Sequence, residues 1–213
     1  PLLHDIGLPF VVHGRATGTT LPYSWVDVNN RRAFHRATDF LLDLGHTRIG
    51  LINGLEFMDF AIRRRTGYLD ALSARGIASD PQLMFQDAMT EYAGFAAARA
   101  MLALAAPPTA FLVASMISGM GVRRALDSSG LVVGRDVSVI IHDDELSYLP
   151  NGSPDGGEVP LFTATRSSVR EAGRLSAEML LSLIARPDQG PQEHLLEAEL
   201  IIGQSTGPAP RKD

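Results

Sequence analysis

Short apolar runs of strand length alternate along this chain with longer segments in which apolar residues recur at helical spacing. The strand-like runs are residues 8–12, 25–28, 48–53, 109–114, 137–142, 162–165 and 195–202. The helix-like segments are residues 30–44, 60–74, 90–104, 117–128 and 169–184. Regular alternation of this kind predicts parallel sheets with helices packed on their faces, and therefore an α/β fold.

Residues with strong positional preferences mark where several of these segments begin and end. Asn29 and Thr90 precede helical stretches and are suited to accept hydrogen bonds from free backbone N–H groups at a helix N-terminus. Gly45 follows a helical stretch and suits the left-handed conformation that often ends a helix. Residues 151–158 (NGSPDGGE) are rich in turn formers and predict a flexible loop.

The composition limits the classes of protein to which the chain can belong. Of its 213 residues, 45% are hydrophobic and 20% are charged, which suits a folded domain with a sizeable core. The absence of cysteine excludes disulfides and thiolate metal sites. The net charge of −5 lacks the basic excess of a nucleic-acid-binding face, so we expect no DNA contact from these residues.

The sequence also indicates where the protein works and what it does not bind. No apolar run reaches the roughly 18 residues that span a membrane, and residues 1–14 lack the pattern of a secretion signal. We therefore predict a cytoplasmic protein with no membrane partner. No cluster of His and acidic residues has metal-ligand spacing, so we predict neither a metal nor a cofactor.

Four segments, taken in order, carry a resemblance to a known family. They are VDVNN with LGHTRIG (26–30, 44–50), RRTGYLDAL (64–72), PTA followed by DVSVIIHDD (108–110, 136–144), and PLFTATR with the later EL and ST pairs (160–166, 199–200, 205–206). Over these segments, and hence over nearly all its length, the chain resembles the lactose-repressor/galactose-repressor family of bacterial transcription regulators.

The resemblance implies a periplasmic-binding-protein type I fold, in which two α/β lobes are joined by three crossing strands and hold a ligand between them. We expect the crossings near residues 25–28, 163–167 and 188–193. The first lobe would then comprise residues 1–27 and 166–191, and the second lobe residues 28–165 and 192–213. Ligands of such sheets bind outside the carboxyl ends of the strands.

The resemblance also implies structure outside these residues. Family members carry an N-terminal helix-turn-helix segment that binds operator DNA, followed by several elements of the first lobe. This chain begins at what resembles a late strand of that lobe. We therefore expect first-lobe strands that lack some of their sheet neighbours, and operator DNA binding through a segment absent from this chain.

Asp143 and Arg64 are the leading candidates for ligand binding. Asp143 follows a predicted strand, and the matching family residue accepts hydrogen bonds from ligand hydroxyls; alternatively, Asp143 and Asp144 only cap the next segment. Arg64 matches a family arginine that enters the cleft, where its planar fork of donors suits vicinal hydroxyls. The alternative for this run of three arginines is a solvated basic face.

Four further candidates have equal or stronger structural interpretations. Ser115 and Ser167 match cleft positions, but each also suits a helix N-cap. Met116 stands beside Ser115 where many relatives have a polar residue, which leaves the ligand's identity open. Trp25 lies at the first crossing and would stack on a sugar ring or else belong to the core. His13 is a weaker candidate from a first-lobe loop.

Two other classes of protein compete with a regulator. An enzyme is disfavoured because His142 and Asp143 are adjacent on a strand and point to opposite faces, and because no nucleophile motif is present. A periplasmic sugar-binding protein of a transporter would share the fold, but the LGHTRI and DVSVI segments are more typical of repressors.

We therefore expect the effector-sensing domain of a repressor that binds a small polyhydroxylated ligand, a sugar or glycoside by family, and that controls operator binding allosterically. We also expect a homodimer formed through residues 169–184 and part of the second lobe. No heptad pattern follows Ser205, so we predict no terminal helical bundle.

Overall fold

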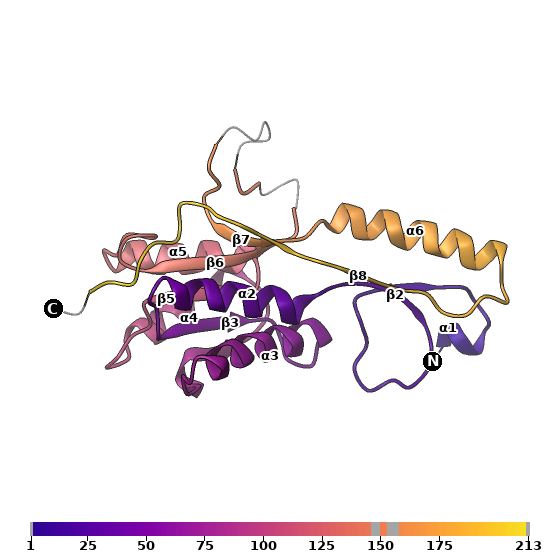
Figure 1. Ribbon diagram of the computed structural model, residues 1–213, viewed down its shortest axis with the longest axis horizontal. Coiled ribbons are helices and arrows are strands. Elements are labelled where there is room, and N and C mark those ends of the chain that lie inside the picture. Colours follow the sequence, from indigo (N-terminus) through magenta and orange to yellow (C-terminus); the bar gives the residue numbers. More distant parts are fainter. Residues whose placement is uncertain (1, 146–149, 153–157, 212–213) are drawn as a thin grey trace.

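The computed structural model describes residues 2–145, 150–152 and 158–211. The molecule is elongated, with a broad α/β body at one end and a slender extension at the other (Figure 1). We refer to the extension as the first lobe and to the body as the second lobe. Residues 153–157 of the loop expected at 151–158 lie outside the described residues.

The second lobe is built on a six-stranded sheet in the order β4-β3-β5-β6-β7-β9. Its strands are β3 (Ile49–Asn53), β4 (Met84–Gln86), β5 (Ala110–Val113), β6 (Ser138–Asp143), β7 (Thr163–Arg166) and β9 (Glu199–Ile201). All neighbouring pairs are parallel except β7 and β9, which are antiparallel. The carboxyl ends of the parallel strands therefore meet at one edge of the sheet, which faces the first lobe (Figure 1).

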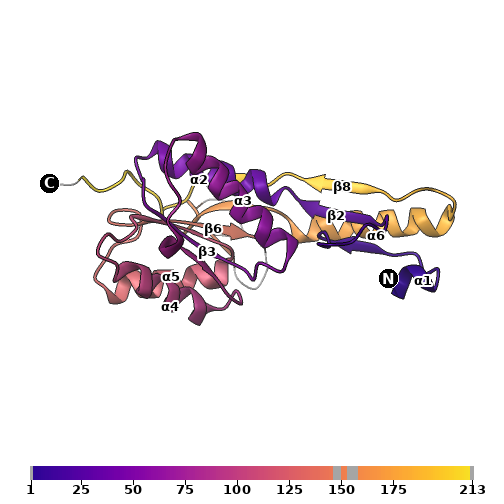
Figure 2. The same ribbon diagram turned by 90° about the horizontal axis from the view of Figure 1, so that it is seen from below.

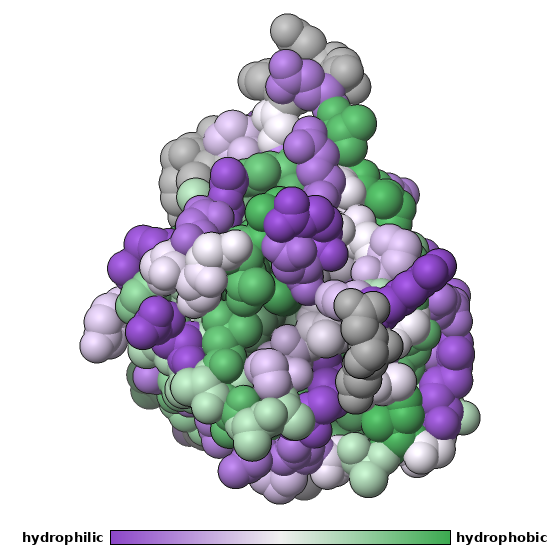
Figure 3. Space-filling model, turned by 90° about the vertical axis from the view of Figure 1, so that its left-hand side faces the viewer, coloured by the Kyte–Doolittle hydropathy of each residue, from purple (hydrophilic) through white to green (hydrophobic). Residues whose placement is uncertain are grey.

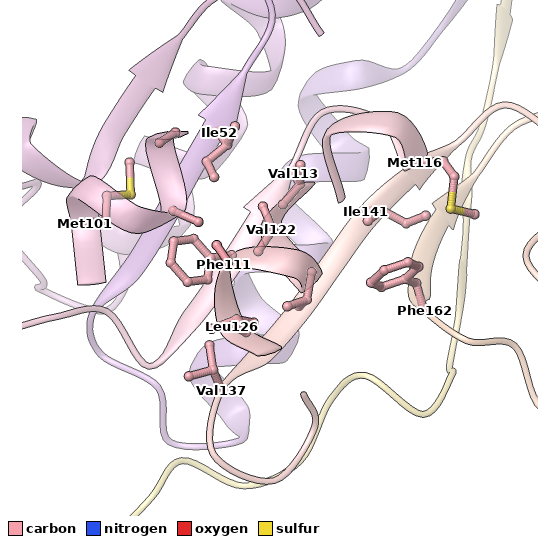
Figure 4. Packing of buried hydrophobic residues seen from close by; sticks show 14 of the residues in the cluster. Ile52, Met101, Phe111, Val113, Met116, Val122, Leu126, Val137, Ile141 and Phe162 are labelled. Atoms are coloured by element: carbon pink, nitrogen blue, oxygen red, sulfur yellow. The ribbon is translucent and has the colours of Figure 1, made fainter. Parts of the chain in front are cut away.

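Helices cover both faces of this sheet (Figure 2). One face carries α2 (Asn30–Asp43) and α3 (Asp59–Ala74), and the other carries α4 (Glu91–Leu102) and α5 (Met116–Ser128). Fully buried strands such as β5 therefore contribute side chains to two cores. Phe111 and Val113 pack toward α4 and α5 (Figure 4), whereas Ala110 and Leu112 pack toward α2 and α3.

Glycines allow each pair of covering helices to approach closely. A Cβ at Gly67 of α3 would lie 2.0 Å from the carbonyl oxygen of Arg31 in α2. A Cβ at Gly121 of α5 would lie 1.9 Å from the carbonyl oxygen of Glu91 in α4. Both distances are far below van der Waals contact, so any larger residue would push the helices apart.

The first lobe contains a three-stranded parallel sheet in the order β1-β2-β8, from β1 (Val11–His13), β2 (Ser24–Val28) and β8 (Glu193–Leu196). The helix α6 (Val169–Ala185) packs on it, and its core joins Val26 to Ala172 and Met179. The short helix α1 (Leu2–Asp5) was not predicted.

The three expected crossings join the lobes, but one lies later than predicted. The first follows β2 into α2, and the second follows β7 into α6. Residues 188–193 form no crossing, because β8 pairs with β2 in the first lobe. The chain crosses at Glu197 and Ala198, between β8 and β9, so the boundary placed at residue 192 is wrong.

Other sequence predictions differ from the structure in detail. The strand expected at 8–12 is β1, which begins at Val11, and the run at 195–202 is divided between β8 and β9. The strand β4 was missed because its three residues are too few to show a period. The predicted caps are confirmed: Asn29 and Thr90 accept from backbone N–H groups of α2 and α4, and Gly45 has a φ of 90°.

Replacing Gly121 by alanine is expected to lower the free energy of unfolding by about 1–3 kcal/mol or more, because the new methyl group meets the backbone of α4. Urea denaturation of the purified chain measures this change. Gly173→Ala is the matched control, since Gly173 lies within α6 with nothing within 4 Å of its virtual Cβ. That variant should gain about 0.5–1 kcal/mol, and equal effects at both glycines would contradict the packing argument.

Candidate functional site

Arg64 is a buried cation at the carboxyl edge of the second-lobe sheet. Its side chain leaves α3, and the residue is 6% exposed. Nε donates to Oδ1 of Asn30 at 2.7 Å, and Nη1 donates to the carbonyl oxygen of Ala114 at 2.8 Å. The guanidinium also lies 5.1 Å from the ring centroid of Phe34 and 4.8 Å from that of Phe60. Two helices, a strand end and two aromatic rings thus fix its position.

The neighbours of Arg64 in the arginine run point elsewhere. Arg63 pairs with Asp59 one turn earlier in α3, and Arg65 pairs with Glu56 at 2.7 Å. Both side chains are partly exposed. The solvated basic face is therefore the correct interpretation for Arg63 and Arg65, but not for Arg64.

None of the ion pairs described for this chain joins a carboxylate to Arg64, although Asp144 and Asp27 lie close enough to act on it electrostatically. Burial lowers the pKa of Arg64 to about 10, and these two acidic residues oppose the shift. The group remains a cation at neutral pH. A buried cation of this kind retains donors for a partner that is not part of the chain.

Asp143 and Arg166 form a second charged pair at the ends of β6 and β7. Asp143 is 4% exposed, its Oδ1 accepts from the backbone N–H of Glu145 at 2.9 Å, and its Oδ2 lies 3.4 Å from Nη2 of Arg166. The contact with Glu145 fits the capping interpretation. It occupies one carboxylate oxygen, while the contact of the second oxygen to Arg166 is longer.

His142 organises a polar network on the opposite face of β6. Its Nδ1 lies 2.9 Å from Oγ1 of Thr165, and its Nε2 lies 2.8 Å from Oδ1 of Asp144 and 3.2 Å from Oγ of Ser167. Strand alternation correctly separates His142 from Asp143. It also brings His142 to Asp144, a convergence that sequence reasoning missed.

The electrostatics of this network keep His142 neutral. Burial and the Arg64 cation lower the pKa of His142 below its ordinary 6.5, although Asp144 opposes the shift. Burial raises the pKa of Asp144, but the hydrogen bond from His142 and the charge of Arg64 lower it more, to about 2. The neutral ring therefore donates from Nε2 to an ionised Asp144, and the Thr165 hydroxyl donates to Nδ1.

The two predicted serines play different roles. Ser115 is the N-cap of α5, because its Oγ accepts from the backbone N–H of Ser118 at 3.2 Å. Ser167 is not a cap, since Ser168 caps α6, and its hydroxyl contacts His142 and Asp144 instead. Met116 is buried in the core beside Ile141 and Phe162 (Figure 4), so its bulk fills the core.

Trp25 and His13 lie on the first-lobe sheet. The half-buried ring of Trp25 lies 4.7 Å from the guanidinium of Arg15, and His13 is exposed. Arg15 also donates to buried Asp27 at 2.7 Å. Asp27 is the first-lobe residue whose charge acts on Arg64, and sequence reasoning did not single it out.

Two buried side-chain atoms among the described residues have no hydrogen-bond partner: Oδ1 of Asn53 and Nε of Arg166. Leaving a buried polar atom unpaired costs about 1–3 kcal/mol. Both atoms belong to the last residues of parallel strands, β3 and β7, in the same sheet. Unpaired polar atoms therefore occur where the fold is expected to place a ligand.

The opposite end of the second lobe has a different character. In Figure 3, which views that end, hydrophilic and hydrophobic residues are intermingled over the surface. A groove there is lined mainly by small apolar residues such as Ala105, Pro107 and Ala209. Its Arg48 already bonds to Asp80 and to the carbonyl oxygen of Ala106.

The chemistry at the carboxyl edge suits hydroxyl recognition. The edge offers two cations, Arg64 and Arg166, and two carboxylates, Asp143 and Asp144, so its formal charges balance. Among the described residues, no group of three or more His or acidic side chains could hold a metal ion. No described helix is long and apolar enough to cross a membrane.

Several members of this cluster were not predicted: Asn30, Asn53, Phe60, His142, Asp144 as a network member, Thr165 and Arg166. Their shared signal is position, since most follow or end a strand at the same edge of the sheet. These residues are better identified by their position, as polar residues at or just after the end of an apolar strand run, than by residue type alone.

Comparison with known proteins identifies relatives of the whole chain. Residues 38–206 match the family described as "Periplasmic binding protein-like domain". The HTH-type transcriptional regulator AglR of Rhizobium meliloti (strain 1021) is 44% identical over 209 residues, which are 98% of this chain and 58% of that protein. RafR of Escherichia coli, also an HTH-type transcriptional regulator, is 35% identical over 184 residues, 85% of this chain and 52% of that protein.

A solved complex of the transcriptional regulator CelR with cellobiose superimposes with a TM-score of 0.84 at 31% identity, covering 96% of this chain and 61% of that chain. The two-lobed fold predicted from the sequence is therefore confirmed. The chain spans a little over half the length of the curated relatives that it matches.

The low pKa of His142 makes stability depend on pH. Below about pH 6.5 the unfolded chain takes up a proton that the folded protein resists until its lower pKa is reached, so the free energy of unfolding falls as the pH drops. His142→Gln should flatten this decline between about pH 7 and 5. His46 is also buried with a lowered pKa, so the double variant with His46→Gln should be flatter still. Urea titrations across this range test the prediction, and a slope unchanged in both variants would contradict it.

Proposed function

Because the chain belongs to the lactose-repressor/galactose-repressor family of transcriptional regulators, as its effector-binding domain, we propose that it binds a small, neutral, polyhydroxylated effector, a sugar or glycoside, between its two lobes. The observation that carries this proposal is the buried Arg64 at the carboxyl edge of the sheet, which has hydrogen-bond partners but, among the residues that the structure describes, no ion-pair partner. The ligand accepts hydrogen bonds from the Arg64 N–H groups that the protein leaves free.

The available donors and acceptors define the class of ligand. Arg64 uses Nε and one Nη1 hydrogen within the protein, which leaves N–H groups for ligand oxygens. Asp143 and Asp144 supply carboxylate oxygens that accept from hydroxyls. Because the charges at this edge balance, an anionic sugar would add an unpaired charge, whereas a neutral one adds none.

One comparison supports a sugar, and two others support a regulator. CelR, whose structure in complex with cellobiose superimposes on this chain, is 31% identical. The relatives named above are regulators, which favours a regulator over the binding protein of a transporter. This membership also agrees with the prediction that the chain is not an enzyme.

We propose that ligand binding closes the lobes around the three crossings and changes the geometry of a DNA-binding segment outside these 213 residues. The named relatives are helix-turn-helix regulators, and this chain spans only part of their length. Asp27 of β2 is poised to couple the lobes, because its charge acts on Arg64 across the junction. Allostery of this kind requires different ligand affinities in the open and closed states.

We further propose a homodimer through α6. Its outer face exposes Leu181 at 67% and Ile184 at 57%, in addition to Val169 at 40%. Leu181 and Ile184 are three residues apart and therefore lie on the same side of the helix. The core side of the same helix is already occupied by Val26 and its neighbours.

A panel of cellobiose, maltose, sucrose, D-glucose, D-glucuronate and adenosine tests the ligand class by thermal shift and calorimetry. A neutral sugar at a hundred times its dissociation constant should add about 2.7 kcal/mol to the free energy of unfolding. Arg64→Lys should weaken its binding by roughly tenfold or more, since lysine lacks the planar fork.

Arg65→Lys is the matched control, because Arg65 is the adjacent, partly exposed arginine of the same run. It should bind the sugar as wild type does. Preferential binding of glucuronate, or equal losses in the two variants, would contradict the proposed site.

Leu181→Asp should convert the dimer into a monomer, because a charge placed in an apolar interface is costly to desolvate. Analytical ultracentrifugation of the intact protein measures the change. Tyr92→Asp, at a residue of α4 that is 73% exposed, is the control and should leave the mass unchanged. A wild-type monomer, or a dimer that survives Leu181→Asp, would refute the interface.

A further inference from the structure

Asn53 ends β3 with an uncommon combination of burial and unfulfilled hydrogen bonding. The residue is 3% exposed, and Nδ2 donates to the carbonyl oxygen of Ala61 at 2.8 Å. Its Oδ1 has no hydrogen-bond partner within the described part of the chain. Exchanging the two amide atoms would place Oδ1 against the Ala61 carbonyl oxygen, so this contact fixes which atom faces away from the helix.

The position of Asn53 connects it to Arg64. Side chains alternate along β3, and Ile49 and Leu51 pack toward α2 and α3, so Asn53 lies on that same face. Ala61, to which it donates, lies three residues before Arg64 in α3. Asn53 therefore contacts the same turn of α3 from which the Arg64 side chain extends.

The neighbouring strand supports the same placement. Ile52 pairs with Val113, so Asn53 lies beside Ala114, whose carbonyl oxygen accepts from Arg64. Phe60 packs over Gly54, the next residue, and over the Arg64 guanidinium. Asn53 and Arg64 thus border the same small region, beneath the same aromatic ring.

We propose that Asn53 determines specificity within the proposed effector site: its Oδ1 accepts a hydrogen bond from one hydroxyl of the sugar while Arg64 donates to neighbouring oxygens. This inference rests on the proposed function. It selects for a hydrogen-bond donor at one position of the ligand, which Arg64, a donor alone, cannot do. An analogue that lacks this hydroxyl leaves a buried acceptor unpaired and binds more weakly.

The unpaired Oδ1 of Asn53 also predicts how a substitution there changes the stability of the ligand-free protein. Asn53→Leu replaces an amide that has an unpaired atom by an apolar group of similar size, and Ala61 keeps its place in the helical hydrogen-bonding pattern. The urea midpoint of the ligand-free variant should therefore equal or exceed that of wild type. If Asn53 served only a structural role, the substitution would instead lower the urea midpoint of the protein.

The test uses the neutral panel sugar that binds, with its series of single deoxy and deoxyfluoro analogues, measured by calorimetry on the full chain. Fluorine cannot donate, so both substitutions at the recognised position should weaken binding to wild type by about tenfold, and neither should matter further in Asn53→Leu. Gln86→Leu is the control, since Gln86 is the register partner of Asn53 in β4 and is exposed. It should show the wild-type pattern.

Each result separates the two claims. If every analogue loses the same factor in wild type and Asn53→Leu, the role of Asn53 is refuted while the effector site stands. If no neutral sugar binds wild type, both fail. Asn53→Ser, which is smaller, replaces the leucine variant in these titrations if the latter does not fold. A destabilised variant with unchanged discrimination among analogues assigns Asn53 to structure and overturns the proposal.

Discussion

The structure depends on how the Arg64 guanidinium is held in a buried place where no described residue forms an ion pair with it. Asn30 of α2 and the carbonyl oxygen of Ala114 take two of its donors, and two aromatic rings cover its faces. These contacts require α2 and α3 to lie close together, which Gly67 permits by leaving room for the backbone of α2. The packing of the second lobe thus determines the chemistry at its edge.

The carboxyl edge of the second-lobe sheet has polar atoms without hydrogen-bond partners among the described residues, and a ligand can bond to them. Asn53 and Arg166 each leave one buried atom unpaired, and Arg64 retains free donors. His142 stays neutral and orders Asp144 and Ser167, so the formal charges balance. A neutral sugar fits these conditions because it brings many hydroxyls and no charge. The first lobe adds Asp27, whose charge acts on Arg64.

The sequence predicted the α/β alternation and the caps at Asn29, Thr90 and Gly45, and it singled out Arg64 within its arginine run, because each depends on local pattern or on the family resemblance. It misplaced the third crossing, since the apolar run at 195–202 was interpreted as one strand, whereas the structure divides it between β8 of the first lobe and β9 of the second. The His142 network was missed because strand alternation was applied to adjacent residues only. The network joins His142 to Asp144, two residues later, and to Thr165 of β7. Asn53 was overlooked because an unpaired atom is a property of the folded neighbourhood. The roles assigned to Asp143, Arg64, Ser115, Ser167, Trp25 and His13 in ligand binding stay predictions.

Hydrogen–deuterium exchange with and without a saturating neutral sugar tests the central claim most directly. The account predicts slower exchange at the carboxyl ends of β3, β5, β6 and β7 and in the first turns of α3, with unchanged exchange at the groove around Ala105 and Pro107 at the opposite end. Protection confined to that groove, or exchange unaltered at every strand end while the sugar is bound, would contradict it.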